Sequence, residues 1–297
     1  MNNLQSTDQA AETSVERPVS PQWLGQRRRA DHRSREQAAD LLEALNTHLK
    51  SVTAAGEPVT VIDVGAGTGS NLAWLAPRLS CAQRWILVDH DTQVLSALEH
   101  PEKLDGVEEI IQVVGTVQDL PALVQELTGG RGPLLITCSA LLDVLSTADI
   151  ESLAEAISGP AAAPTTAALL SLSVTGEVDF SPAHQHDEAI AAAFNAHQRR
   201  NGLLGPDAVD AVVPALGQRG AHTALRSTDW QLDQDEDVLV EQYIRERAAV
   251  AVEHDPGLEA AAKIWGEDRQ RQLAAGQLRV RVGHTDVLSL PAPAHPG

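Results

Sequence analysis

Apolar positions divide much of the chain into short β-branched runs that alternate with stretches of helical spacing. The runs are continuously apolar, which is typical of strands that are buried on both faces of a parallel sheet. We expect strands at 59–63, 85–89, 108–114, 133–138 and 166–174, and helices near 71–79, 92–99, 119–127 and 148–158. Right-handed crossovers between such strands build a doubly wound layer.

The segments on either side of these strands follow other patterns. Residues 1–21 are polar and lack periodicity, so we expect a flexible arm. An apolar stripe at helical spacing over 36–50 predicts a helix ahead of the first strand. The stripe consists of Ala38, Leu41, Leu42, Leu45 and Leu49.

The pattern changes again after residue 174. Residues 176–220 show no strand pattern and contain two expected helices, at 187–200 and 207–216. We interpret this segment as a helical cap inserted after the fifth strand. A strand at 221–227, helices at 238–253 and 258–274, and a final strand at 277–284 follow. The final run alternates apolar and polar residues, which indicates an antiparallel, half-exposed strand and brings the predicted α/β sheet to seven strands.

Composition narrows the classes of partner. The 297 residues include 41 acidic and 22 basic side chains, and the net charge of −19 disfavours nucleic acid or an anionic membrane as a partner. Five Trp, one Tyr and two Phe offer few platforms for base stacking. No apolar stretch reaches membrane-spanning length, and the polar start lacks a secretion signal. Two cysteines are too few for a disulfide framework. We expect a soluble, cytoplasmic protein that is a monomer or a homodimer.

The most informative motif follows the first strand and reads Asp63-Val64-Gly65-Ala66-Gly67-Thr68-Gly69. Glycines there permit unusual backbone angles and close approach of a ligand. The spacing differs from the dinucleotide fingerprint, which requires Gly-x-Gly-x-x-Gly or Ala. Asp63 would repel a pyrophosphate and suits a cationic ligand. A nucleotide fold that binds NAD, or that uses the glycines only for a tight turn, remains an alternative.

The arrangement resembles class I S-adenosylmethionine-dependent methyltransferases, whose motif I is commonly Asp/Glu-x-Gly-x-Gly-x-Gly. The resemblance covers about 59–174 and includes Asp89, which ends the second strand 26 positions after Asp63. In that family an acidic residue at this place binds both ribose hydroxyls, since a carboxylate has two acceptor oxygens. Thr116 stands where the family commonly has an acidic residue near the adenine. The fourth strand resembles motif IV, which passes under the reacting methyl group.

The resemblance implies a Rossmann-like methyltransferase domain over 22–297 that uses S-adenosylmethionine as its cofactor. Within it, 22–56 would form an N-terminal helical lid, 57–175 the cofactor-binding core, 176–220 the helical cap, and 221–297 the C-terminal strands and helices. The implied cofactor-binding residues are Asp63, Gly65, Ala66, Gly67, Gly69, Asn71, Asp89, His90, Thr116, Val117, Cys138 and Ser139.

Methyl transfer mainly requires an acceptor held in line with the methyl group and the exclusion of water. His184 and His186 follow the fifth strand, and either could accept a proton near neutral pH. The alternative is a solvated loop in which Asp187 caps the next helix. The two histidines, Asp187 and His197 could converge on a metal, but their spacing matches no known ligand geometry, so we expect none.

A second group of candidates is basic. Arginines cluster ahead of the first predicted helix, and Arg200 ends the first helix of the cap. We expect Arg28, Arg29, Arg33 or Arg200 to recognise a carboxylate or phosphate on the substrate through the guanidinium fork. Pairing with acidic surface groups is the alternative for each of them. Asp143 is a further candidate, which would hold the amino group of methionine or begin a loop.

We therefore predict methyl transfer from S-adenosylmethionine to a small acceptor by in-line displacement without a metal. An oxygen, as a hydroxyl or carboxylate, is the expected acceptor atom, because no signature of amino-group methylation follows the fourth strand. The alternatives are an NAD-dependent oxidoreductase and a non-catalytic protein that binds S-adenosylmethionine. Aminopropyl transfer is disfavoured, because its usual acidic motif is not recognisable after the fourth strand.

Overall fold

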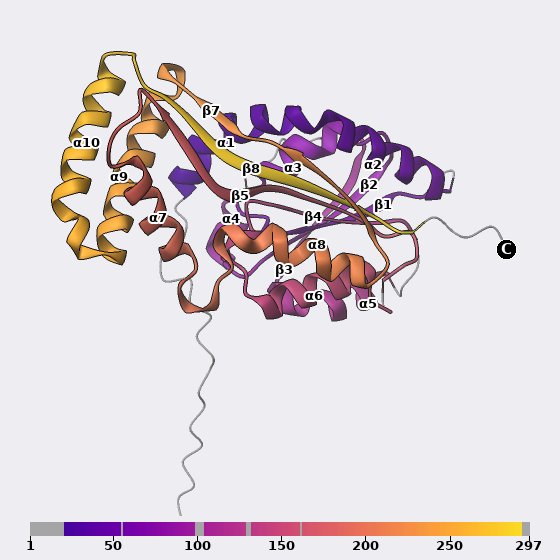
Figure 1. Cartoon of the computed structure of the whole chain (residues 1–297). Helices are drawn as coiled ribbons and strands as arrows, with labels where there is room; N and C mark the ends of the chain where they lie inside the picture. The colour runs from indigo at the N-terminus through magenta and orange to yellow at the C-terminus, as the bar shows by residue number, and fades with distance from the viewer. Residues whose placement is uncertain (1–20, 55, 99–103, 129–131, 161, 293–297) are drawn as a thin grey trace, which may run out of the picture.

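The computed structural model describes residues 21–54, 56–98, 104–128, 132–160 and 162–292. The arm predicted at 1–21 lies outside these residues, except for Pro21. An eight-stranded sheet runs through the molecule with helices on both faces (Figure 1). The strands are β1 (Val59–Val64), β2 (Gln83–Asp89), β3 (Val107–Val114), β4 (Leu134–Ser139), β5 (Ala167–Ser181), β6 (His222–Ser227), β7 (Trp230–Leu232) and β8 (Arg279–Leu290).

The strand order confirms the predicted doubly wound sheet. The path is β3-β2-β1-β4-β5-β8-β6, and β7 pairs with β8. Strands β1 to β5 are parallel to one another, whereas β8 is antiparallel to β5, β6 and β7. The sheet has one strand more than predicted, because the three residues of β7 are too few to show a period.

Two predictions for the late strands are wrong. The absence of a strand after residue 174 is contradicted by β5, which continues to Ser181. The last strand is not half-exposed, because β8 lies between β5 and β6 and most of its residues are buried. The buried Asp286 of β8 accepts hydrogen bonds from the backbone N–H of Leu172 (2.7 Å) and the hydroxyl of Thr228 (2.8 Å). The sequence pattern therefore overstated the exposure of the strand.

Helices cover both faces of the sheet (Figure 1). One layer contains α1 (Pro21–Arg35), α2 (Ala39–Val52) and α3 (Ser70–Leu75), and the other contains α5 (Leu120–Thr128), α6 (Thr147–Ser158) and α8 (Ala208–Gln218). Successive strand residues point to opposite layers: Val61 packs with the leucines of α2, whereas Ile62 packs with α6 and α8. Burial on both faces explains why the strands are continuously apolar. The short α4 (Thr92–Ser96) follows β2.

The cap predicted at 176–220 is only partly correct, because α8 packs on the sheet beside α6. The helical cap observed at one end of the sheet has its own apolar core. It consists of α7 (Asp187–Gln198), α9 (Asp237–His254) and α10 (Glu259–Ala274), which pack around the ends of β5, β7 and β8 (Figure 1). The indole of Trp265 is fully buried, meets Phe180 edge-on at 5.4 Å, and donates to Asp187 at 2.7 Å. This contact joins α10 to α7 and β5.

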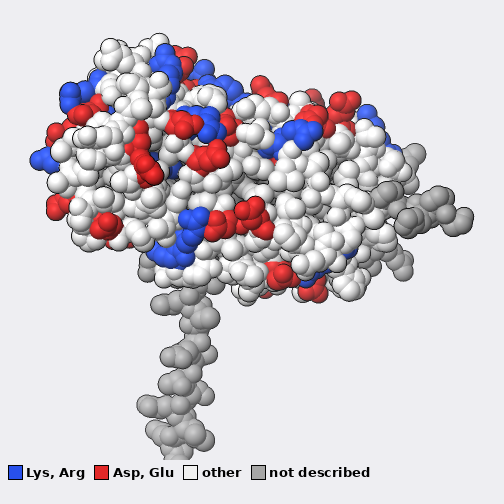
Figure 2. All heavy atoms as spheres, in the orientation of Figure 1, with Lys and Arg blue, Asp and Glu red and all other residues white. Residues whose placement is uncertain are grey.

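Two properties concern the predicted partners, namely the apolarity of the helices and the distribution of charge on the surface. Among the described residues, no helix combines the length and apolarity needed to cross a membrane. Acidic and basic side chains are interspersed over the face drawn in Figure 2.

The buried Trp265 gives a first prediction. Trp265→Ala removes a fully buried aromatic side chain and its hydrogen bond, so the free energy of unfolding should fall by about 3–5 kcal/mol. Its neighbour Ile264 is 48% exposed, and Ile264→Ala should change that free energy by less than about 0.5 kcal/mol. Urea unfolding followed by circular dichroism measures both, and equal losses would contradict a separately packed cap.

Candidate functional site

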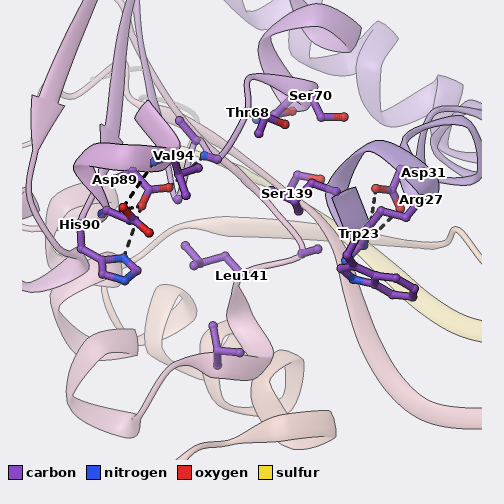
Figure 3. A pocket seen from close by; sticks show the side chains of 18 of the residues that line it. Trp23, Arg27, Asp31, Thr68, Ser70, Asp89, His90, Val94, Ser139 and Leu141 are labelled. Carbon is purple, nitrogen blue, oxygen red and sulfur yellow. Dashed lines mark hydrogen bonds and ion pairs between the residues drawn. The ribbon is translucent and has the colours of Figure 1, made fainter. Parts of the chain in front are cut away.

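A cavity of about 440 Å³ opens at the carboxyl ends of β1, β2 and β4. The strand order reverses between β1 and β4, and ligands of doubly wound sheets bind at such switch points. Figure 3 shows Asp89 and His90 on one side of the cavity, Trp23, Arg27 and Asp31 on the opposite side, and Leu141 between them. Segments from four regions of the chain thus meet at this cavity.

The glycine loop forms the floor of the cavity. Gly65, Gly67 and Gly69 have φ angles of +65°, +56° and +82°, which other residues rarely adopt. A Cβ on Gly65 would lie 2.9 Å from Cδ1 of Leu141, so a side chain at this position would also collide with the cavity wall. The motif therefore places bare backbone against the cavity.

Asp89 is oriented by the backbone around it. Its side-chain oxygens accept hydrogen bonds from the N–H groups of Gly67 (2.9 Å) and Asp91 (3.0 Å), and Nδ1 of His90 lies 3.4 Å from Oδ1. Each carboxylate oxygen has a second lone pair. Asp89 is 7% exposed and lines the cavity, so it can accept further hydrogen bonds from a ligand.

A buried polar chain lies beneath the glycine loop. Nδ2 of Asn71 donates to Asp63 (2.6 Å) and to the hydroxyl of Thr137 (3.2 Å), while Nη1 of Arg35 donates to Oδ1 of Asn71 (2.9 Å). The guanidinium of Arg35 also stacks on Trp74 at 3.8 Å. Burial raises the pKa of Asp63 to about 7 and lowers the pKa of Arg35 to about 10. These hydrogen bonds connect the end of α1 to the ends of β1 and β4.

Helix α1 forms one wall of the cavity and was missed as a helix of its own. Trp23, Leu24, Arg27 and Asp31 line the cavity, and Arg27 donates to Asp31 through Nε (2.8 Å) and Nη2 (3.1 Å). Trp230 of β7 donates to the same carboxylate at 3.0 Å. The positions 23, 24, 27 and 31 share one helical face, and that spacing was the available signal.

The segment after β4 forms the remaining wall. Ser139, Ala140, Leu141 and Asp143 line the cavity. Ala140 has a φ of +54°, a strained conformation for a residue with a Cβ. Removal from solvent raises the pKa of the Asp143 carboxyl to about 6. Asp143 is therefore largely ionised at neutral pH and gains a proton at mildly acidic pH.

A second cavity of about 150 Å³, here called the inner chamber, shares walls with the first. Trp23, Arg27, Ala140 and Asp143 line both. The further walls of the inner chamber come from β5, α7, β7, α9 and β8, so two helices of the cap contribute to it. Those walls include Glu177, Phe194, Trp230, Tyr243, Arg247 and His284.

Most of the predicted cofactor residues meet at the first cavity. Those that line it are Gly65, Ala66, Gly67, Asn71, Asp89, His90 and Ser139. Asp63 and Cys138 are fully buried beneath it, and Gly69 lies in the turn before α3. Thr116 and Val117 do not line it: the Thr116 hydroxyl donates to Asp119 at 2.8 Å, and Val117 packs in the core. Val94 of α4 lines the cavity instead, beside His90.

The predicted catalytic histidines lie in the cap and line neither cavity. Nε2 of His184 is 3.2 Å from Asp268 of α10, and its backbone N–H donates to Asp187. The capping alternative is wrong, because Asp187 is the first residue of α7 and the N-cap is His186. The rings of His186 and His184 lie 5.3 Å apart and are tilted by 48° to each other. In the described part of the chain, no group of three or more His, Cys, Asp or Glu side chains could hold a metal ion.

The predicted substrate arginines also lie elsewhere, whereas Asp143 lines both cavities. Arg33 pairs with Glu236 at 2.5 Å, and this carboxylate is buried rather than one of the surface groups that the alternative expects. Arg29 is exposed, and neither Arg28 nor Arg200 lines a cavity. Arg27 and Arg247 are the arginines in the described cavity walls, and sequence reasoning singled out neither for substrate binding. Only the assembled fold reveals which face of α1 and α9 points inward.

No family model and no curated protein matches the chain. Similar solved structures include two SAM-dependent methyltransferases in complex with S-adenosyl-L-homocysteine. The one from Thiobacillus denitrificans is 14% identical, with 92% of this chain and 100% of that chain covered and a TM-score of 0.43. The one from Geobacter sulfurreducens is 14% identical, with 85% of this chain and 90% of that chain covered and a TM-score of 0.41. A cyclopropane synthase from Mycobacterium tuberculosis is 11% identical, with 83% of both chains covered and a TM-score of 0.41. With TM-scores below 0.5, these likenesses do not decide the chemistry of this chain.

The raised pKa of Asp63 gives a prediction for stability. Between pH 4 and about 7 the unfolded chain releases this proton while the folded protein keeps it, so the free energy of unfolding falls as the pH rises. Asp63→Asn removes this titration, and the variant should gain stability relative to the wild type across that window. Urea unfolding at several pH values measures the difference.

The control is Asp40→Asn, which removes an exposed carboxylate paired with Arg226 and should change the free energy of unfolding by no more than about 1 kcal/mol. A difference between Asp63→Asn and the wild type that stays constant from pH 4 to 7 would show that Asp63 ionises normally.

Proposed function

We propose that this protein transfers a methyl group from S-adenosylmethionine to a small-molecule acceptor. The observation that carries the proposal is the charge of the cavity at the switch point. Asp31, Asp89, Asp91 and Asp143 line it, against the single cation of Arg27 among the described lining residues. Such a wall favours a ligand with a positive sulfonium and ammonium, and it would repel the pyrophosphate of NAD.

The residues of the cavity fit the cofactor in three places. The glycine loop offers backbone that a ligand can approach closely, since Gly65, Gly67 and Gly69 carry no side chain and have positive φ angles. Asp89 is held at the end of β2 with lone pairs to spare for the two ribose hydroxyls. His90 and Val94 continue the wall beyond Asp89, where the adenine would lie.

When bound, S-adenosylmethionine supplies a methyl group on a positively charged sulfur, which an acceptor atom can take by in-line displacement. The chain's own residues then have two tasks, to align the acceptor and to keep water out. Trp23, Leu24 and Leu141 present apolar surface to the cavity from α1 and from the segment after β4. These side chains exclude water from the reacting atoms.

Asp143 is the proposed catalytic residue in place of the cap histidines. It lines both cavities, so it lies where an acceptor in the inner chamber would meet a cofactor in the outer one. Its carboxylate can accept a hydrogen bond from an acceptor hydroxyl and take the proton as the oxygen gains the methyl group. An oxygen acceptor is therefore the proposal that this position supports best.

A prediction for binding tests the cofactor. Asp89→Ala removes the carboxylate proposed to hold the ribose, and loss of charge-assisted hydrogen bonds worth about 1.5–3 kcal/mol should weaken S-adenosylhomocysteine binding roughly ten- to hundredfold. Isothermal titration calorimetry measures the affinity. Asp105→Asn, at an exposed position in the turn before β3, is the matched control and should bind as the wild type does.

The same titration distinguishes the alternatives. If the wild type binds NAD but not S-adenosylhomocysteine, it belongs with the oxidoreductases. A protein that binds S-adenosylhomocysteine but labels nothing in a metabolite extract with radioactive S-adenosylmethionine would be a non-catalytic binding protein.

A prediction for catalysis concerns Asp143. With the acceptor identified by labelling, Asp143→Asn should lower kcat by about 10²–10⁴-fold, because an amide cannot take the proton. In the wild type, kcat should fall as the pH drops below about 6, where the carboxyl becomes protonated. A pH–rate profile checks this, and an unchanged kcat in Asp143→Asn would remove Asp143 from the reaction.

A further inference from the structure

The inner chamber contains a buried cation with unused hydrogen-bonding capacity. Arg247 of α9 lines the chamber and is only 4% exposed. Its Nε donates to the hydroxyl of Tyr243 at 2.6 Å, and its guanidinium lies over the rings of Phe194 (4.2 Å) and Tyr243 (4.9 Å). Among the described residues, however, its Nη1 has no hydrogen-bond partner. A buried donor without a partner is costly, which indicates that a ligand supplies the acceptor.

Tyr243 adds a second donor at the same place. Its oxygen accepts the hydrogen bond from Arg247, so its own proton remains available to donate. Burial raises the pKa of the Tyr243 phenol, which keeps that proton in place at neutral pH. The guanidinium and the phenol thus offer two adjacent donors, which match the two oxygens of a carboxylate.

The other charged groups of the chamber limit the charge of this ligand. Arg27 is already paired with Asp31, and Glu177 is paired with Arg281 at 3.1 Å. Burial lowers the pKa of His284 to about 4, so this side chain is neutral. Asp143, which also lines the chamber, would repel the second charge of a dianion such as a phosphate monoester. A monoanion is therefore favoured.

The remaining walls indicate what carries the anion. Trp23, Trp230 and Phe194 present aromatic surface to the chamber. Flat apolar surfaces of this kind bind aromatic or other apolar bodies.

We infer that the inner chamber is an acceptor subsite for a small aromatic carboxylic acid, whose carboxylate is bound by Arg247 and Tyr243. This inference rests on the proposed function, since it makes the chamber ligand the methyl acceptor. The carboxylate would anchor one end of the acceptor in the cap, and a hydroxyl at the other end would reach Asp143 where the two cavities meet. Arg247 is then a specificity-determining residue.

The experiment uses the full chain and matched pairs of probes. Benzoate, 3-hydroxybenzoate, 4-hydroxybenzoate and phenylacetate are each compared with the corresponding amide by isothermal titration calorimetry, with and without saturating S-adenosylhomocysteine. At least one carboxylate should bind roughly tenfold or more tightly than its amide, because the amide is neutral. Phenyl phosphate should bind more weakly than that carboxylate.

Two variants of α9 locate the anion. Arg247→Gln should abolish the preference for the carboxylate while S-adenosylhomocysteine binds as in the wild type. Arg245→Gln is the matched control, because Arg245 is exposed on the same helix and pairs with Glu241. Arg247→Lys keeps the positive charge and should restore part of the preference. The preference of the wild type needs no variant, so the test holds even if Arg247→Gln does not fold.

The outcomes separate the two proposals. The carboxylate subsite is wrong if S-adenosylhomocysteine binds but no carboxylate binds more tightly than its amide. It is also wrong if S-adenosylhomocysteine binds and phenyl phosphate binds more tightly than every carboxylate. In both cases the proposed methyltransferase stands. If a carboxylate binds through Arg247 but S-adenosylhomocysteine does not bind, the chamber is a carboxylate site and the proposed function fails. Equal carboxylate binding by Arg247→Gln and the wild type would also overturn the subsite.

Discussion

The site depends on the buried contact of Asn71 with Asp63 and Arg35. Asn71 donates to the carboxyl group at the end of β1 and accepts from the guanidinium at the end of α1. Carboxyl and guanidinium groups are costly to bury when they are ionised. The amide between them donates to one carboxyl oxygen and accepts from one guanidinium nitrogen. Because the same amide lies at the start of α3, the contact fixes the glycine loop and α1 relative to each other.

The walls of both cavities follow from that position of α1. With Arg35 held at its end, the helix presents Trp23, Arg27 and Asp31 to the open side of the sheet. Trp230 of β7 donates to Asp31, so α1 is also joined to the strands beneath the cap. Arg27, paired with Asp31, becomes part of the partition between the outer cavity and the inner chamber.

The sequence predicted those parts of the site that depend on local order along the chain. The glycine loop and Asp89 each follow a buried strand directly, so parallel strands bring them to one edge. Helix α1 was harder to predict, because Arg27, Arg28 and Arg29 in succession obscure its inward face. Arg247 could not be predicted, because the apolar and polar residues of α9 show little helical segregation when both sides pack against neighbours.

The two cavities differ in the charge that they offer, and this difference would order the ligands. The outer cavity has four carboxylates, whereas the inner chamber adds a buried guanidinium with a free donor. The outer cavity would favour a cationic cofactor and the inner chamber an anionic acceptor. In the reverse arrangement, each ligand would lie beside groups that carry its own charge. The shared wall at Asp143 and Ala140 then becomes the place where the two ligands meet. In the proposed reaction, this difference in charge would help to align donor and acceptor before any residue takes part in the chemistry.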